Sequence, residues 1–211
     1  MSDIAIRIFC EGVSDQRFLR DFLKAHYQID ISDKDLKNNK FIENLGSWNK
    51  LKIQKEKITE SFSEFTSLIF LDADNEKVTE KAGFEETINF VNDLMSEWNW
   101  EKYDVFVLPN HQDNGTVEDL LENIINFKNK KIFDCWEGFE DCLSKDYSLT
   151  IPAKKSKIYS YLECLHEVTN QEKDKCKDAN RDFLNENLWD IKNLENPYIS
   201  KIKEFLDKHL K

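Results

Sequence analysis

The sequence predicts an α/β fold: an open, mainly parallel sheet flanked by helices, followed by a mostly helical C-terminal extension. Short apolar runs alternate with amphipathic helical patterns along the first 128 residues, as in parallel α/β folds. The run over 68–71 is continuously apolar, which is typical of a strand buried on both faces. Beyond about residue 130 the pattern is mainly helical. We therefore expect an α/β domain over 1–128 and a helical extension over 129–211 packed on it.

The first strand and helix are predicted near the start of the chain. Residues 4–10 are rich in β-branched side chains, and this strand ends at Glu11 and Gly12. Ser14 is the expected N-cap of the next helix. The apolar face of that helix carries Phe18, Leu19, Phe22, Leu23 and Tyr27. A short second strand is expected within 41–46 and a helix over 50–63.

The later elements follow from the same periodicities. The apolar run over 68–71 is followed by Asp72, with Asp74 two residues further on. A helix is expected from Thr79, a strand over 103–108, and a helix that begins at Thr116. The apolar side chains of the helix from Thr79 are Phe84, Ile88, Val91, Met95 and Trp98. Asp119 pairs with Thr116 as in a capping box, and Asn196-Pro197 predicts the start of the last helix.

The composition restricts the class of protein. The chain of 211 residues has 40% hydrophobic residues, which predicts a globular fold. No membrane span or signal peptide is visible, so we expect a cytoplasmic protein without membrane contact. The five cysteines form no Cys-x-x-Cys pair, and we expect most to be small buried side chains. The net charge of −11 argues against tight, unaided binding to nucleic acid.

Acidic side chains follow three of the predicted strands. Glu11 comes after the first, Asp72 and Asp74 end a central one, and Glu118 follows the next through a loop. Ligands of open α/β sheets bind at the carboxyl edge, where all four acids are expected. Within a strand, Asp72 and Asp74 point the same way. Oxygen-only ligands suit a hard cation, so the four acids predict a Mg²⁺ or Mn²⁺ site.

Simpler interpretations of these acids stay open. Residues 72–75 also read as a turn whose short polar side chains bond their own backbone. Glu118 also suits the first turn of a helix, because a negative charge there interacts favourably with the helix dipole. A calcium loop is disfavoured, since the sixth position holds Lys77 instead of glycine. A haloacid-dehalogenase-type phosphatase is disfavoured as well, because Glu76 stands where that family has Thr or Val.

The order and spacing of these motifs resemble the TOPRIM fold, the α/β domain shared by topoisomerases, primases and some nucleases. The resemblance rests on residues 8–12, an apolar run followed by Glu-Gly, and on residues 69–74, which end in Asp-x-Asp. More narrowly, Leu108-Pro109 and the segment 115–121 resemble the uncharacterised bacterial family DUF3226. Trp189-Asp190 and Phe205-Leu206 also fit that family. The resemblance implies a TOPRIM-like sheet.

The resemblance also implies a function. Glu11 would bind the metal or act as a general acid or base, Asp72 and Asp74 would hold Mg²⁺, and Glu118 would complete the site. Lys154, Lys155 or Lys157 would contact the phosphate, and we select Lys157 as the catalytic lysine. The expected activity is divalent-metal-dependent phosphoryl transfer on DNA or RNA, as in a TOPRIM-type nuclease.

A non-enzyme interpretation is kept beside the nuclease. In it the chain is a metal-binding or regulatory domain that acts with a partner, such as a separately encoded ATPase. The net charge of −11 favours this alternative. The chain shows no topoisomerase tyrosine domain, primase zinc ribbon or P-loop, so a nuclease is the simplest enzyme interpretation.

Overall fold

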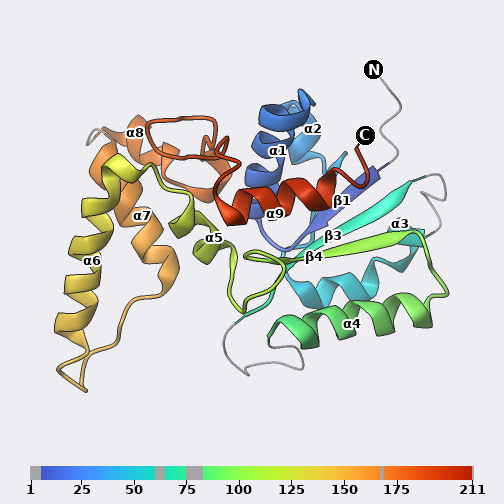
Figure 1. Cartoon of the computed structure of the whole chain (residues 1–211), viewed down its shortest axis with the longest axis horizontal. Helices are drawn as coiled ribbons and strands as arrows, with labels where there is room; N and C mark the ends of the chain where they lie inside the picture. The colour runs from blue at the N-terminus through green and yellow to red at the C-terminus, as the bar shows by residue number, and fades with distance from the viewer. Residues whose placement is uncertain (1–5, 60–64, 75–82, 167–168, 211) are drawn as a thin grey trace.

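A four-stranded, wholly parallel sheet forms the centre of the described structure (Figure 1). The computed structural model describes residues 6–59, 65–74, 83–166 and 169–210. The strands are β1 (Ile6–Cys10), β2 (Ile42–Asn44), β3 (Thr66–Asp72) and β4 (Tyr103–Leu108), in the order β2-β1-β3-β4. The α/β class and the parallel sheet predicted from the sequence are thus confirmed.

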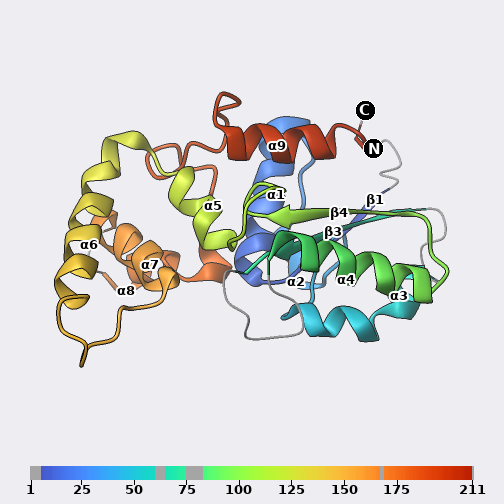
Figure 2. The ribbon, with the colours of Figure 1, turned by 60° about the horizontal axis from the view of Figure 1, so that its bottom comes forward.

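Both faces of the sheet are buried, as the apolar run in β3 predicts. Leu68 and Phe70 belong to one hydrophobic cluster and Ile69 and Leu71 to the other, because successive side chains of a strand alternate. The first cluster includes side chains of α1 (Val13–Tyr27) and α9 (Pro197–Leu206). The second cluster includes those of η1 (Trp48–Ile53), α3 (Lys55–Thr59) and α4 (Phe84–Glu97). Figure 2 shows the sheet between these two helical layers.

Two local predictions were wrong. The expected helix over 50–63 is the 3₁₀ segment η1 followed by the short helix α3, and residues 60–64 lie outside the described part. Helix α1 begins at Val13, with Gly12 instead of Ser14 at the N-cap position. Helix α4 begins at Phe84, and the predicted start at Thr79 lies outside the described residues.

The extension is mostly helical, and its last helix returns to the sheet. Two short elements, α5 (Val117–Asn123) and η2 (Phe127–Asn129), precede the extension. The extension then contains, in chain order, α6 (Lys130–Leu143), α7 (Lys154–Leu165), α8 (Asn170–Lys175), η3 (Asp178–Asn180) and α9. The Phe205 ring on α9 lies 5.5 Å from Phe70 and 5.3 Å from Phe106, measured between centroids. Figure 1 shows α6 and α7 at the end of the molecule away from the sheet. Side chains of both parts of the chain therefore share one core.

The remaining features are helix α2, the cysteines and the lengths of the helices. Helix α2 (Asp33–Lys37) lies between α1 and β2 along the chain. Among the five cysteines, which are all free, only Cys10 and Cys176 are buried, so the expectation of mostly buried thiols was wrong. No helix in the described ranges combines the length and the apolar character that crossing a bilayer requires.

Candidate functional site

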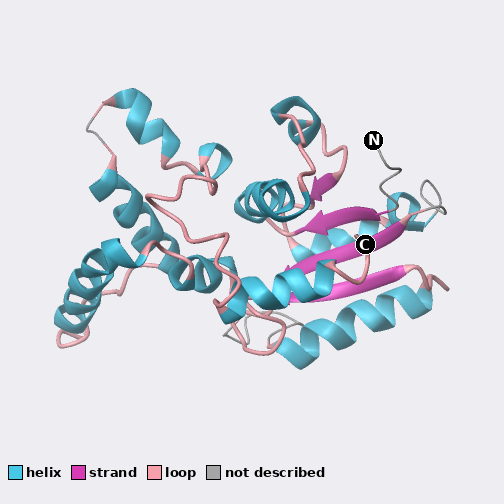
Figure 3. Cartoon of the chain, turned by 45° about the horizontal axis from the view of Figure 1, so that its top comes forward, coloured by secondary structure: helices cyan, strands magenta, loops and turns pink. Residues whose placement is uncertain are grey.

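A cavity of about 310 Å³ lies at the carboxyl edge of the sheet. The strand arrows in Figure 3 all point toward this edge, which is also the helical end of the molecule. Five acids line the cavity: Glu11, Asp15, Asp72, Glu118 and Asp178. The parallel strands bring Glu11 and Asp72 together because both side chains follow or end neighbouring strands, β1 and β3. Helix α5 adds Glu118 from its first turn.

The Glu11 carboxylate is held by backbone groups from two segments. Its Oε1 accepts a hydrogen bond from the Trp48 N–H at 3.2 Å, and its Oε2 accepts one from the Asp72 N–H at 3.4 Å. These bonds tie the end of β1 to the end of β3 and to the start of η1. Glu11 is therefore a fixed acid of the cavity wall, in contrast to a solvated loop acid.

The Asp72 carboxylate links β3 to α5. Its Oδ1 accepts a hydrogen bond from the Val117 N–H at 2.9 Å, at the first residue of the helix. Asp119 caps the same helix, since its Oδ2 accepts the Thr116 N–H at 2.8 Å, as the sequence predicts. Asp119 is therefore engaged in the helix cap, and Glu118 is the acid of this turn that lines the cavity.

Asp15 is a member of this cavity that the sequence analysis missed. It is only 2% exposed, and its Oδ2 accepts the Gly12 N–H at 2.6 Å at the start of α1. Its other oxygen, Oδ1, is buried and has no hydrogen-bond partner. The expected N-cap at Ser14 concealed it; with Gly12 as the cap, the acid three residues later would have stood out as a capping residue.

The crowded carboxylates disturb one another. Burial raises the pKa of Asp15 to about 7, and the negative charges of Glu11 and Glu118 add to this, while the Gly12 hydrogen bond opposes it. Burial also raises the pKa of Asp72 well above its ordinary value, and the charges of Asp15 and Glu11 add to it. The cavity therefore favours neutralisation of these acids, either by protonation of the carboxylates or by a bound cation.

Asp74 is the predicted ligand that does not line the cavity, although its charge adds to the raised pKa of Asp72. Strand β3 ends at Asp72, and Asp74 has a left-handed backbone with φ of 58°, so strand alternation does not govern its direction. Its N–H donates to the Gly115 carbonyl at 2.9 Å. Asp74 is absent from the described residues that line the cavity.

The extension supplies a basic side chain to the cavity, but not the one that we selected. Lys155 on α7 lines the cavity and pairs with Asp178. Lys157 pairs instead with Glu122 at 3.0 Å and lies 5.0 Å above the Phe133 ring. Lys154 pairs with Asp119. Nothing in the local sequence separates these three lysines, because their roles depend on acids that lie far away along the chain.

A buried arginine fixes this part of the extension against α1. The Arg181 Nη1 donates to the Ser14 Oγ at 2.9 Å, and its Nη2 lies 2.8 Å from the Asp178 Oδ1. The Arg181 side chain is fully buried. Ser14 and Asp178 both line the acidic cavity, so residues near 180 hold a wall of a site that begins at residue 11.

The donor chemistry of the cavity fits a hard cation, although the carboxylates are not arranged to coordinate one directly. All five acids offer carboxylate oxygens, which Mg²⁺ and Mn²⁺ prefer, and the Asp15 Oδ1 lacks a partner. Over the described ranges, no group of three or more His, Cys, Asp or Glu side chains is placed to hold a metal ion. Direct coordination would therefore require the carboxylate side chains to move closer to one another around the ion.

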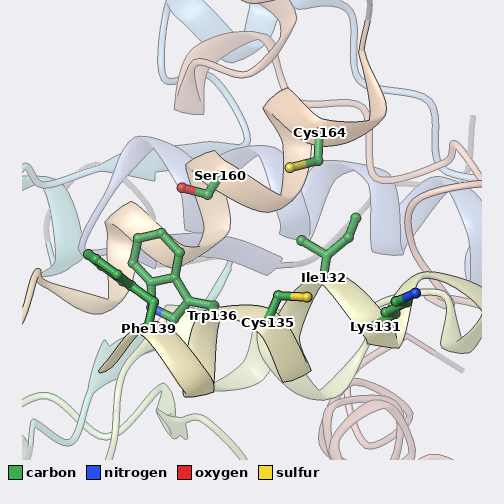
Figure 4. A pocket seen from close by; sticks show the side chains of 7 residues that line it. All are labelled: Lys131, Ile132, Cys135, Trp136, Phe139, Ser160 and Cys164. Atoms are coloured by element: carbon green, nitrogen blue, oxygen red, sulfur yellow. The ribbon is translucent and has the colours of Figure 1, made fainter. Parts of the chain in front are cut away.

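A second, apolar cleft lies between α6 and α7, away from these acids (Figure 4). Its volume is about 520 Å³. Ile132, Cys135, Trp136 and Phe139 line it from α6, with Lys131 at one side, and Ser160 and Cys164 border it on α7. None of the described residues that line it is an acid, so it offers no ligands for a hard cation.

Comparisons with known proteins yield a single family. No curated protein matches the chain, and no solved structure matches it either. The model of one protein family matches residues 6–210, which is nearly the whole chain. That family is described as "Protein of unknown function (DUF3226)". The resemblance of the motifs at 108–121 to DUF3226 is thereby confirmed, and the chain belongs to this family.

Proposed function

We propose that the acidic cavity binds Mg²⁺ or Mn²⁺ and that the protein catalyses phosphoryl transfer on nucleic acid, as a TOPRIM-type nuclease. The observation that carries this proposal is the convergence of Glu11, Asp72 and Glu118, from three strand–helix junctions, in one cavity. Like charges crowded together away from water are costly, and a divalent cation among them relieves the repulsion. Burial first, and then the charges of Asp15 and Glu11, raise the pKa of Asp72, so a negative charge there is costly without a cation.

In this proposal the carboxylates have separate tasks. Asp72 and Glu118 bind the cation, with Asp15 as a further ligand through its unpartnered Oδ1. Glu11, held by two backbone N–H groups, either joins them or accepts the proton of the attacking water. The cation, when bound, would neutralise a phosphodiester and activate water. Asp74 is not assigned as a ligand in this proposal, since it is not among the described residues that line the cavity.

One lysine lines the acidic cavity and a second lies beside one of its lining residues, and in this proposal both would meet a phosphodiester. Lys155 stands on the wall formed by the extension. The Lys50 ammonium lies beside Gly46 on the η1 side, 2.9 Å from the position that a Cβ at Gly46 would take. A chain with a net charge of −11 needs such local positive charge to hold a polyanion near its acids.

A cleavage assay with matched lysine variants tests this proposal. The substrates are labelled single- and double-stranded DNA and RNA, each with Mg²⁺, with Mn²⁺ and with a chelator. The wild type is expected to cleave at least one substrate only with the divalent ion. Lys155→Met is expected to lower that rate about 10-fold, while Lys157→Met, whose ammonium pairs with Glu122, leaves it within about twofold. A larger loss in Lys157→Met than in Lys155→Met would contradict the assignment of Lys155.

The non-catalytic alternative rests on the absence of a closed metal group in the described residues and on the net charge of −11. It describes a metal-binding or regulatory domain that acts with a partner protein. This alternative predicts that the pure protein cleaves none of the four substrates while it still binds Mn²⁺. The same assay, joined to a binding measurement, therefore separates the two functions.

A further inference from the structure

A third cavity, of about 230 Å³, lies within the extension. Its polar lining includes His166, Lys175, Arg181, Asn185 and Trp189. Asp182 is the one acid among the described residues that line it. In a chain with a net charge of −11, a cavity with two permanent cations and one acid is unusual. It shares no lining residue with the acidic cavity.

One edge of the Arg181 guanidinium makes no hydrogen bond, although one of its two nitrogens forms an ion pair with Asp178. Its Nη1 bonds to Ser14 and its face lies 5.2 Å from the Tyr159 ring. The Nε and Nη2 atoms have no hydrogen-bond partner, and Nη2 meets Asp178 only as an ion pair. These two nitrogens share one edge of the guanidinium, and their parallel N–H groups match two oxygens of a carboxylate or a phosphate.

Trp189 contributes a second buried donor without a partner. Its indole Nε1 has no hydrogen-bond acceptor, and the side chain is 1% exposed. The rings of Phe183 and Tyr161 lie 5.1 and 5.5 Å away, so packing restricts the indole and it cannot turn to another acceptor. A buried donor without an acceptor destabilises a protein, because it has lost its hydrogen bonds to water and gained none in return. Two such residues on one cavity therefore point to an acceptor that the cavity receives.

We propose that this cavity binds a small oxyanion, a phosphate or carboxylate group, between Arg181 and Trp189. Lys175 and His166 stand at the same cavity and both pair with Glu172, so they are held beside it. An oxyanion would supply acceptors to the Arg181 edge and to the Trp189 indole at once. The Asp182 carboxylate opposes binding and limits it to modest affinity.

The indole N–H of Trp189 provides a direct readout of this site. In a ¹H–¹⁵N spectrum of the metal-free protein, the five tryptophans each give one indole signal. Titration with inorganic phosphate is expected to shift the Trp189 signal along a saturating curve. The other four signals are expected to stay in place. Sodium chloride at equal ionic strength is the reference, and acetate distinguishes a carboxylate from a phosphate as the ligand. Trp189→Phe identifies the signal; if that variant does not fold, substitution of the other four tryptophans identifies it by elimination.

A matched pair of lysine variants tests the place of binding. Lys175→Gln removes a charge at the cavity and is expected to weaken phosphate binding at least about 5-fold. Lys145→Gln removes an exposed charge from the turn after α6 and is expected to leave binding unchanged. A Trp189 shift that fails to saturate, or that chloride reproduces, would overturn the proposal. Equal binding by the two variants would overturn it too. The buried donors would then be bonded to water alone. Neither result bears on the metal site.

Discussion

Replacing Asp72 by asparagine is expected to lower divalent-dependent cleavage of nucleic acid at least about 100-fold. Asparagine keeps the size of the side chain and an oxygen that accepts the Val117 N–H, so α5 stays attached to β3. It removes the charge that would hold the cation. The measurement is the initial rate on labelled DNA and RNA with Mg²⁺ or Mn²⁺, with circular dichroism as a check of the fold.

The control for this variant is Asp141→Asn, which removes an exposed carboxylate on α6 far along the chain from the acidic cavity. Its cleavage rate is expected to equal that of the wild type. Equal rates for Asp72→Asn and the wild type would show that the activity comes from elsewhere, such as a contaminating nuclease. Loss of rate together with loss of the fold would call for Glu118→Gln as a second test on the helix side of the cavity.

The metal-free protein is expected to lose stability as the pH rises from 5 to 8. The pKa of Asp15 is about 7 in the folded protein and near 3.8 in the unfolded chain, so folding favours the protonated acid. The stabilising contribution of such a group is complete below its unfolded pKa and is lost as the pH rises through its folded pKa. Asp72, whose pKa is also raised, adds to the loss in the same direction.

The expected decrease in the free energy of unfolding is on the order of 2–4 kcal/mol over this range. Urea unfolding at pH 5, 6, 7 and 8 with a chelator measures it. Asp72→Asn is expected to show a smaller decrease, because one of the titrating acids is gone. Burial lowers the pKa of His26 and His111 below the ordinary 6.5, so these two groups stabilise the folded protein more as the pH rises toward that value and offset part of the decrease. Acids with lowered pKa, such as Asp33 beside Arg17, lose their contribution only below about pH 4 and do not enter this window. A constant or rising stability between pH 5 and 8 would contradict the account of the cavity.

The strands and helices that could be predicted are those with strong local patterns. Strand β3 is a continuous apolar run, and α4, α5 and α9 carry regular apolar faces or clear caps. The segment 50–63 is different, because two short pieces of helix pack Leu51 and Ile58 onto the sheet without the regular turn that the spacing suggested. Tertiary contacts decided that segment, and they cannot be read from periodicity.

The candidate site could be predicted where it depends on the direction of the strands. Parallel strands bring Glu11, Asp72 and Glu118 to one edge, and the sequence shows which residues follow each strand. Asp74 lies beyond the end of β3, where its left-handed backbone conformation, and not strand alternation, sets its direction. Asp178 and Lys155 reach the cavity from more than 140 residues after Glu11, through the packing of Arg181 against Ser14. No local pattern carries that information.

The most direct test of the central claim is Mn²⁺ binding to the acidic cavity at pH 8. Electron paramagnetic resonance measures free Mn²⁺ as protein is added, with no need for a substrate. The wild type is expected to bind Mn²⁺ at a saturable site, Asp141→Asn to bind it equally, and Asp72→Asn to bind it at least about 10-fold more weakly. Equal binding by the wild type and Asp72→Asn, or no saturable binding by the wild type, would contradict a metal site at these carboxylates.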